Sequence, residues 1–550
     1  MPCLSIIYLM EKIKKILTEY LPYLGVSLLI SLPWFFKPGY LFFTDLPWGP
    51  TIKTSFTNNW FFTETIFILF NYIIPSDIIQ KLFLTVIFLT LLLTAKHFIK
   101  NFTKNKWLSL ALSSFALFNP FVYDRLGYGQ VGILLSLGFT ILTISFFIKF
   151  LNNFQYKNLV WAGISTGLAI MYSMHLIFII LPFYLLFLIL IMFKIKKVKI
   201  HKLIIFLVLI SLIIIIINLN WLYPFLKGSS GQAHTVNQTI NQQHYQAFQT
   251  AGRSETDALK NVLMMSGFWG KENWRYKDLT KFKQNWGVSF ILLLPLFIYG
   301  FYNGLKNKNY RQLTIGLTII FIISATLALG IRAGIIKNIT YWAFENIPAY
   351  KGLRETQKWV LNLVVIYFFF LTLGSVKIFK SKIISKNFLP YLTLLIIIIL
   401  QAPLLVWGMA GQVKPAQYPN DWYQVNQYIL EETNCQSKTL FLPWHLYMGF
   451  GFIGNITTNP AKLYFDCPII SGDNMEIPGV AYQSHSPKNQ LIHKWLQTQG
   501  QAKILQELNI KHIILARDAD WQNYSWLNDL PELELLQNNR NLILYQVKYE

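Results

Sequence analysis

Charged side chains stand directly beside long apolar runs at three places in this sequence. Asp45 lies in KPGYLFFTDLPWGP and Asp124 lies in FNPFVYDRLGYGQ, and each follows an apolar segment. A carboxylate at a water–lipid boundary is partly desolvated, so it can act as a general base, and it can also bind a divalent cation. The structural alternatives are that Asp45 caps a helix in an interfacial turn and that Asp124 pairs with Arg125 to close a helical hairpin.

The third place is YKGLRETQKWV, residues 350–360, where Arg354 and Lys358 flank Glu355. A guanidinium group can bind phosphate through two parallel hydrogen bonds, and an ammonium group adds a compact positive charge. This cluster therefore predicts a phosphate-binding site, and a surface ion-pair network is the alternative.

Aromatic and imidazole side chains near these positions could contact a substrate. Trp48 belongs to the same loop as the first carboxylate and is typical of the aromatic belt at a membrane interface. Trp269 lies in SGFWGKENW, the aromatic cluster in the last part of a long polar segment at about 225–285. This segment is either a flexible surface excursion or a loop that binds sugar hydroxyls and ring faces. His175 ends an apolar run and is either a ligand or a capping residue.

Long apolar segments must position all of these residues. The chain has 550 residues, of which 54% are hydrophobic and 13% are charged, which is typical of a polytopic membrane protein. Apolar runs of about 17 to 25 residues, enough to cross about 30 Å of hydrocarbon, recur along the chain. We predict eleven spans, near residues 20–36, 80–96, 107–123, 130–150, 158–174, 176–193, 203–223, 286–302, 312–330, 359–376 and 388–409.

Residues 60–75 are interpreted as an interfacial or re-entrant helix, because this run is short, contains Glu64 and Asn71, and ends at Pro75. With this choice every loop assigned to the cytoplasm carries lysine or arginine, and the five loops after the N-terminal segment contain neither Asp nor Glu. This pattern predicts a multi-pass protein of the cell membrane, with its N-terminus in the cytoplasm and its C-terminal domain outside. Since topology and anionic lipid explain most of the net charge of +23, the lipid bilayer is the expected partner and nucleic acid is not.

Two domains are predicted. Residues 1–410 form a transmembrane helical domain, and residues 411–550 form a soluble extracytoplasmic α/β domain. In the second domain, KTLFLP, KHIILA, LELLQ and NLILYQV have the composition of strands, while NDWYQVNQYILEE and SPKNQLIHKWLQTQGQAKILQEL have helical spacing. Cys435 and Cys467 both fall in this tail, where a disulfide and two free thiols are equally compatible with the sequence. The predicted fold class is therefore mainly α, a polytopic helical membrane protein with a C-terminal α/β domain.

Several of these segments together carry a family resemblance. The carboxylate in the first external loop, the Asn-Pro-Phe-x-x-Asp-Arg turn, the Leu-Arg-Glu-x-Gln-Lys-Trp segment, and YPNDWYQVNQYI with LFLPWHLY in the tail resemble prokaryotic GT-C-type membrane glycosyltransferases. Among these, the YfhO-like membrane proteins and the membrane domain of mycobacterial arabinofuranosyltransferases are most similar in architecture. The resemblance extends over most of the chain.

The resemblance implies a transferase that moves one hexose or pentose from a polyprenyl-phosphate donor to a glycan, lipid or protein acceptor outside the cytoplasm. In that family the first-loop carboxylate is the catalytic base or a ligand of Mg²⁺ or Mn²⁺, and it maps onto Asp45. Asp124 matches the second acidic position, although the doubled acidic pair of the family is absent here. The departing phosphate is then expected to contact Arg125, Arg354 and Lys358. The residues expected to contact substrate elsewhere are Trp48, His175, Trp269 and Glu355.

Two other functions fit the same residues. A transporter or flippase of a lipid-linked saccharide would bind phosphate without breaking a bond, but it predicts ionisable residues deep inside the spans, and almost none occur there. A non-catalytic protein of envelope assembly with the same architecture is the other alternative, because a fold does not establish turnover.

Overall fold

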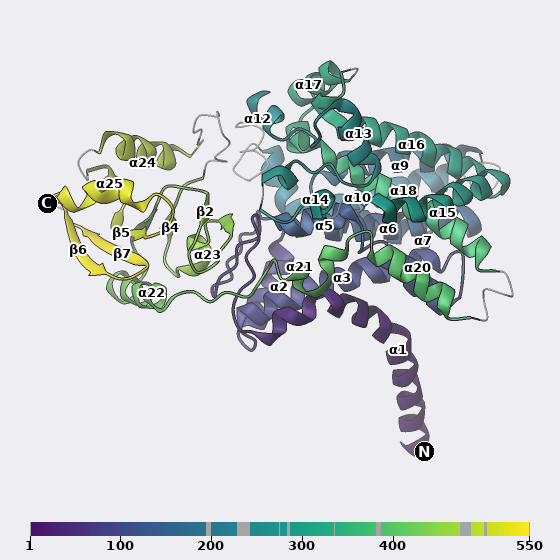
Figure 1. The fold of residues 1–550 in the computed structure, drawn as a ribbon, viewed down its shortest axis with the longest axis horizontal. Helices are drawn as coiled ribbons and strands as arrows, with labels where there is room; N and C mark the ends of the chain where they lie inside the picture. The colour runs from purple at the N-terminus through teal and green to yellow at the C-terminus, as the bar shows by residue number, and fades with distance from the viewer. Residues whose placement is uncertain are drawn as a thin grey trace.

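The computed structural model describes residues 2–193, 200–227, 242–273, 275–282, 287–334, 336–380, 387–473, 484, 486–499 and 503–548. Long helices form one large body, and the strands lie in a separate lobe at the carboxyl end (Figure 1). The first helix, α1, projects from the helical body at the end far from that lobe (Figure 1). The basic run at 194–199 and the middle of the long polar segment, 228–241, lie outside the described residues.

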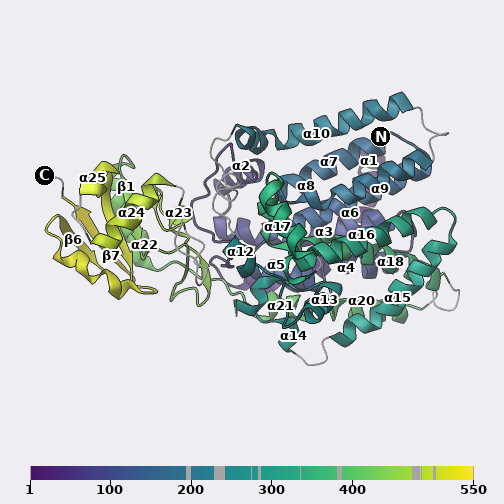
Figure 2. The same cartoon turned by 90° about the horizontal axis from the view of Figure 1, so that it is seen from above.

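The helical body contains most of the α-helices of the chain, and several lie nearly side by side when it is seen from above (Figure 2). Its helices are α1 (Pro2–Ser31), α2 (Phe61–Asn71), α3 (Ser76–Ile99), α4 (Lys106–Ser114), α5 (Pro120–Tyr128), α6 (Val131–Asn153), α7 (Lys157–Tyr172), α8 (Leu176–Ile179), α9 (Leu181–Phe193), α10 (Ile200–Leu226), α12 (Gln242–Ala247), α13 (Glu255–Leu263), α14 (Leu279–Phe282), α15 (Gly287–Lys306), α16 (Arg311–Leu329), α17 (Lys337–Asn346), α18 (Val360–Ile378), α20 (Leu389–Ile399) and α21 (Val406–Ala410). Short 3₁₀ turns join some of them, including η1 (Leu32–Phe36), η3 (Trp269–Asn273), η5 (Tyr350–Arg354) and η6 (Thr356–Trp359).

Within the described residues, seven helical segments are long and apolar enough to cross a membrane. They are Ser76–Ile99, Val131–Asn153, Leu176–Phe193, Ile200–Leu226, Gly287–Lys306, Arg311–Arg332 and Thr356–Ile378. An eighth span results if the pair Leu389–Ile399 and Pro403–Ala410, bent by 81°, counts as one. The chain is thus a multi-pass helical membrane protein, as predicted, but the count of eleven spans is not confirmed.

Three predicted spans, at 20–36, 107–123 and 158–174, have no counterpart among these segments. The second of these is broken, because α4 ends after nine residues and α5 begins only at Pro120. Proline is favoured at the first position of a helix, and the side chain of Asn119 accepts a hydrogen bond from the backbone N–H of Val122 at 3.0 Å, which caps α5. The sequence Asn-Pro therefore converts an apolar run into two short helices.

The helices differ in how they meet their surroundings. In the segment Thr356–Ile378, which contains α18, 94% of the apolar stretch is buried inside the protein. In α10 only 11% of the apolar stretch is buried. A helix that is apolar all round and buried belongs to the centre of a bundle, and one that is apolar and exposed suits contact with lipid. α18 is thus the central helix, and the 350–358 segment at its N-terminal end is held firmly in place.

The predicted short helix at 60–75 is present as α2, which has 11 residues and no buried side chain. Its length is too small for a span, as the sequence indicated.

The C-terminal lobe is built on a five-stranded sheet with the order β4-β1-β5-β7-β6. β1 pairs in parallel with β4 and β5, and β7 pairs antiparallel with β5 and β6. The strands and helices of the lobe are α22 (Asn420–Thr433), β1 (Lys438–Leu442), β2 (Tyr447–Gly449), β3 (Ile456–Thr458), α23 (Ala461–Tyr464), β4 (Ile469–Ile470), α24 (Pro487–Thr498), α25 (Lys503–Glu507), β5 (Ile510–Ala516), β6 (Leu533–Asn538) and β7 (Leu542–Val547). All four predicted strands are present, and the predicted second helix is divided into α24 and α25.

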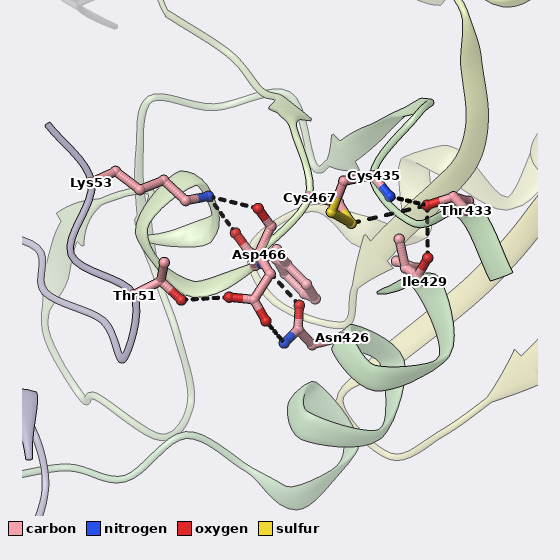
Figure 3. Close-up of a disulfide and its surroundings, with 9 residues drawn as sticks. Thr51, Lys53, Asn426, Ile429, Thr433, Cys435, Asp466 and Cys467 are labelled. Atoms are coloured by element: carbon pink, nitrogen blue, oxygen red, sulfur yellow. Dashed lines mark hydrogen bonds between the residues drawn. A yellow bond between two sulfur atoms is a disulfide. The ribbon is translucent and has the colours of Figure 1, made fainter. Parts of the chain in front are cut away.

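The lobe is joined to the helical body by hydrogen bonds as well as by the chain. Thr51 Oγ1 donates to Asp466 Oδ1 at 2.8 Å, and Lys53 Nζ donates to the backbone oxygen of Phe465 at 2.6 Å (Figure 3). Cys467, which follows Asp466, forms a disulfide with Cys435, two residues after the end of α22 (Figure 3). Of the two states that the sequence allowed for these cysteines, the structure contains the disulfide.

Candidate active site

A cavity of about 720 Å³ lies where the 37–60 loop, the start of α6, the α7–α8 junction, the end of α10 and the 348–358 segment meet. Much of its wall is apolar and includes Phe67, Phe83, Phe178, Trp221 and Phe225. Its polar lining includes Asp45, Gln130, His175, Arg354, Glu355 and Lys358 on one side, together with Lys53, Asn58 and Glu64. A single cavity therefore collects most of the residues that the sequence singled out.

Asp45 is held in this wall by three hydrogen bonds. Its backbone N–H donates to the carbonyl of Tyr128 at 2.8 Å, its Oδ1 accepts from Tyr447 Oη at 2.9 Å, and its Oδ2 accepts from Gln130 Nε2 at 3.1 Å. No helix begins at this residue, since the next one, α2, starts at Phe61. The helix-capping alternative for Asp45 is therefore wrong.

The Asp45 carboxyl has a pKa closer to neutral pH than that of an ordinary aspartate. Its removal from water raises the pKa of the Asp45 carboxyl to about 6, and the negative charge of Glu355 acts in the same direction. The hydrogen bonds from Gln130 and Tyr447 and the positive charge of Arg275 act in the opposite direction, because they favour the ionised form. The group is consequently a stronger base than an ordinary aspartate and is still ionised at pH 7.

The second hydrogen bond to Asp45 comes from Gln130, which directly precedes α6. The preceding Gly129 has a φ of +90°, and a Cβ there would lie 2.7 Å from Cβ of Phe43 and 2.9 Å from the backbone nitrogen of Leu46. Only glycine allows this turn and this close approach together. The loop that carries Asp45 is thus packed against the α5–α6 turn that carries Gln130.

Gln130 connects two carboxylates of the cavity wall, Asp45 and Glu355. Its Nε2 donates to Asp45 Oδ2 and also to Glu355 Oε1 at 3.2 Å, while its Oε1 accepts from Arg125 Nη1 at 2.5 Å. Because Arg125 can only donate, it fixes which end of the amide faces the carboxylates.

Glu355 and Arg125 form a buried ion pair. Arg125 Nη1 donates to Glu355 Oε2 at 2.6 Å, and the side chains are 1% and 5% exposed. Although burial opposes ionisation, the positive charges of Lys358, Arg125 and Arg354 hold the pKa of the Glu355 carboxyl well below its usual range. Arg125 packs over the ring of Phe268 and is not part of the cavity wall. The structure therefore places Arg125 behind Glu355 and not at the predicted phosphate site.

The other two predicted cations do reach the cavity. Lys358 Nζ lies 3.5 Å from Glu355 Oε2 and donates to His175 Nε2 at 3.1 Å. Arg354 packs over the ring of Phe248 at 4.9 Å, and its Nε is buried without a hydrogen-bond partner in the described part of the chain. Arg354 thus presents donor capacity that no neighbouring carboxylate uses.

His175 is an acceptor for the lysine. Burial lowers the pKa of the His175 imidazole well below its usual value, and the charge of Lys358 adds to this effect. The ring Nδ1 lies 3.1 Å from Ser173 Oγ, and the side chain makes no capping hydrogen bond at the start of α8. His175 therefore belongs to the polar wall of the cavity.

Asp124 lies apart from this network. It is 3% exposed and accepts hydrogen bonds from Ser266 Oγ and Tyr276 Oη, both at 3.1 Å. Burial raises the pKa of its carboxyl to about 7. Because Arg125 pairs with Glu355, the predicted alternative in which Asp124 and Arg125 close a hairpin as an ion pair is wrong.

These positions bear on the expected divalent cation. Asp45 and Asp124 have separate hydrogen-bond partners, and only Asp45 lines the 720 Å³ cavity. Across the described ranges, no three His, Cys, Asp or Glu side chains converge as metal ligands do. A joint site of Asp45 and Asp124 for Mg²⁺ or Mn²⁺ does not fit this geometry, so we derive no step through a metal ion.

The two tryptophans differ in position. Trp48 lines the cavity beside Phe67 and Phe83, and its indole Nε1 is buried without a partner in the described residues. Trp269 packs edge-on against Phe248 and lies outside the wall of this cavity. Only Trp48 is therefore placed to contact a ligand here.

Two residues of the site were not predicted from the sequence, Gln130 and Tyr447. Tyr447 starts β2 and is paired with Thr458 of β3, and the backbone N–H of Thr458 donates to the carbonyl of Thr44 at 2.8 Å. This short hairpin brings the hydroxyl group of Tyr447 to Asp45, which is 402 positions away in the chain. Tyr447 is the last residue of LFLPWHLY, one of the segments that carry the family resemblance, but nothing in this segment indicates the contact with Asp45.

No protein-family model matches this sequence, and a search of curated proteins also found no match. Solved structures do match. The cryo-EM structure of arabinofuranosyltransferase AftD from Mycobacteria is similar with a TM-score of 0.56 and 12% identity, over 96% of this chain and 40% of that chain. A mutant of the same AftD is similar with a TM-score of 0.51 and 12% identity, over 96% of this chain and 41% of that chain.

The fold is similar to that of the matched part of arabinofuranosyltransferase AftD. The resemblance expected from the sequence is thereby confirmed for the fold. This chain spans about two fifths of the AftD chain that it matches, and at 12% identity the similarity concerns the fold alone.

The arrangement of the cavity has clear chemical capacities. A carboxylate with a raised pKa can accept a proton, Arg354 and Lys358 can hold an anion, and the apolar wall can take a hydrocarbon chain. Three cations, Lys53, Arg354 and Lys358, line this cavity with three carboxylates, Asp45, Glu64 and Glu355. An anion is therefore expected to bind locally, at Arg354 and Lys358, and not through an excess of positive charge in the whole wall.

Proposed function

We propose that this protein is a glycosyltransferase that moves a sugar from a polyprenyl-phosphate donor to an acceptor hydroxyl outside the cytoplasm, in the synthesis of cell-envelope glycans or glycoconjugates. One observation carries the proposal: a basic carboxylate, Asp45, and two cations, Arg354 and Lys358, share one cavity, much of whose wall is apolar. The GT-C-type fold adds support. The lysines and arginines of the loops assigned to the cytoplasm support the outward orientation.

In the reaction, the acceptor oxygen attacks the anomeric carbon of the donor sugar, and the bond between that carbon and the phosphate oxygen breaks. Asp45 takes the proton of the acceptor hydroxyl as the new glycosidic bond forms. Tyr447 and Gln130 each donate to one oxygen of Asp45, which fixes the orientation of the carboxylate. Correct orientation of a general base contributes through proximity as well as through proton transfer.

The leaving group is the polyprenyl phosphate, which gains negative charge as the bond breaks. Arg354 and Lys358 stabilise this charge more strongly in the transition state than in the bound donor. Glu355 stands next to Lys358, but its charge is balanced by Arg125 at 2.6 Å, so it does not repel the phosphate strongly.

The prenyl chain needs an apolar path beside the phosphate. α10 contributes Trp221, Leu222 and Phe225 to the cavity wall, and it is the least buried of the membrane-spanning helices described. A donor can therefore keep its hydrocarbon tail against α10 and in lipid while its phosphate reaches the polar wall.

The test compares purified wild type with Asp45→Asn on a panel of polyprenyl-phosphate sugars and envelope acceptors. We expect transfer by the wild type, a loss of about 10²- to 10⁴-fold in Asp45→Asn, and equal donor binding by both. Asp529→Asn, a change of the same type at an exposed site in the C-terminal lobe, is the matched control and should transfer like wild type.

Every reaction is run with EDTA and again with Mg²⁺ or Mn²⁺, which tests the predicted divalent cation. Undiminished transfer by Asp45→Asn refutes the role of the base. Tight donor binding by both proteins with no transfer by either refutes the enzyme and favours the transporter or envelope-assembly alternatives.

A further inference from the structure

A second cavity, of about 570 Å³, lies on the other side of the chain segment that carries Asp45. Phe42, Phe43 and Thr44 line this second cavity, whereas Asp45 lines the first. Its remaining wall comes from residues 271–278, from the exit of the helical body at 409–413, and from Asn455 and Ile456 at the start of β3. It therefore lies at the junction of the helical body and the C-terminal lobe.

The wall of the second cavity is basic. Lys271, Arg275 and Lys277 line it together with one acid, Asp278. Asp278 is already engaged, because its Oδ1 accepts from the backbone N–H and the hydroxyl group of Thr280, both at 2.8 Å. The side chains that line this cavity thus include three cations and one carboxylate.

Two of these cations form no ion pair within the described residues. Lys271 is 6% exposed, and in the described part of the chain its ammonium group makes no ion pair and no hydrogen bond. The Nη1 atom of Arg275 is buried and has no hydrogen-bond partner among the same residues. Lys271 is close enough to Asp124, and Arg275 to Asp45, for each positive charge to favour the ionised carboxylate, but neither cation forms an ion pair with it in the described residues. Both cations can therefore still bind an anion that enters the cavity.

The other lining groups suit a sugar. Phe42, Phe43 and Tyr276 are aromatic side chains of the wall, and Asn455 contributes an exposed amide. A volume of about 570 Å³ falls within the usual range of small-molecule sites.

The second cavity is linked to the proposed base by one pair of contacts. The guanidinium carbon of Arg275 lies 5.1 Å from the ring centroid of Tyr447, and the hydroxyl group of Tyr447 donates to Asp45 at 2.9 Å. A ligand bound to Arg275 is therefore one side chain away from Asp45, on the side opposite to the first cavity.

We propose that the second cavity binds the acidic group of a saccharide, a carboxylate or a phosphate, on the acceptor that receives the transferred sugar. The binding of an acidic saccharide stands on the cavity itself, whereas its role as acceptor rests on the proposed function. In this arrangement the donor occupies the first cavity and the acidic group of the acceptor occupies the second, and the reacting hydroxyl of the acceptor extends past the Asp45 segment to the donor.

The experiment measures saccharide binding to the purified full chain in detergent, without donor, by titration calorimetry. The probes are tetragalacturonate against its carboxyl-reduced neutral form, and mannose 6-phosphate against mannose. We expect at least one acidic probe to bind ten-fold or more tightly than its neutral partner, and the pair that discriminates identifies carboxylate or phosphate. Equal affinities within both pairs overturn the proposal.

Substitutions then locate the site. Lys271→Gln and Lys277→Gln should each weaken binding of the acidic probe several-fold, and Lys277 is exposed, so its replacement does not endanger folding. Lys260→Gln, which removes an exposed lysine of α13 outside both cavities, is the matched control and should bind like wild type. Losses no larger than that of the control overturn the assignment to this cavity.

The two proposals fail in different ways. If the acidic saccharide binds and depends on Lys271 and Lys277 but no donor supports transfer, the binding site stands and the proposed reaction is refuted. If transfer proceeds to neutral acceptors and acidic probes do not bind, the reaction stands and the acidic specificity is refuted.

Discussion

Replacing Tyr447 with phenylalanine removes one of the two hydrogen bonds that hold the Asp45 carboxylate. The hydroxyl group of Tyr447 donates to Oδ1 at 2.9 Å, while Gln130 remains on Oδ2. This hydrogen bond stabilises the ionised form of Asp45, so its loss raises the pKa of the carboxyl further above its present value of about 6.

The size of this shift follows from the geometry. A buried hydrogen bond to a charged group contributes about 1.5–3 kcal/mol, and one pKa unit corresponds to about 1.4 kcal/mol. The pKa of Asp45 in Tyr447→Phe is therefore expected to be about one to two units higher, at about 7 to 8.

The assay is the pH dependence of kcat/KM for sugar transfer. Because the base acts only when ionised, the rate should fall as the pH drops through the pKa of Asp45, with a midpoint near 6 in the wild type. In Tyr447→Phe the midpoint should move up by one to two units, and the plateau at high pH should be preserved. Tyr423→Phe, at an exposed tyrosine that is 48% accessible, is the control and should leave the profile unchanged.

A lowered plateau with an unmoved midpoint would refute this reasoning. It would mean that Tyr447 contacts the substrate and does not tune the base.

Three further predictions concern stability and are each measured by unfolding of the purified protein in detergent. Glu355→Gln leaves Arg125 buried without its counter-charge and should destabilise the fold by about 3–5 kcal/mol, and an unchanged melting temperature would contradict the buried pair. In the folded protein the pKa of the Asp45 carboxyl is raised to about 6, so this group binds protons more readily than in the unfolded chain, and the free energy of unfolding should fall as the pH rises from about 4 to 6. This pH dependence should be weaker in Asp45→Asn. An identical dependence in the variant would count against the raised pKa. Cys435→Ser opens a loop of 32 residues closed by Cys467 and should cost about 3–4 kcal/mol, and a reductant should destabilise the wild type but not the variant.

The sequence was a good guide to the fold wherever the signal is local. Apolar length predicted the central spans, and alternating or helical spacing predicted the four principal strands and the α22 helix of the lobe. It failed at 107–123, where composition indicated a span but the Asn-Pro pair starts a new helix. A capping residue acts on a few backbone groups, and a measure of average apolarity does not register it.

The site was predicted only in part. Asp45, Arg354 and Lys358 stand out in the sequence because a charge beside an apolar run is costly, and all three line one cavity. Asp124 and Arg125 stand out for the same reason, yet they face other partners. A charged residue beside an apolar run must therefore have a partner, but the sequence does not indicate which residue or ligand that partner is.

The sequence by itself determined that this chain is a multi-pass helical membrane protein with an α/β tail, because apolar length and periodicity act within each element. Only the tertiary structure decided that Arg125 pairs with Glu355, 230 positions away, and that Tyr447 reaches Asp45 across 402 positions. Such contacts depend on how helices pack and on how the lobe docks on the 43–46 loop, where the carbonyl of Thr44 meets β3. No spacing along the chain encodes these distances, and they decide which carboxylate is the candidate base.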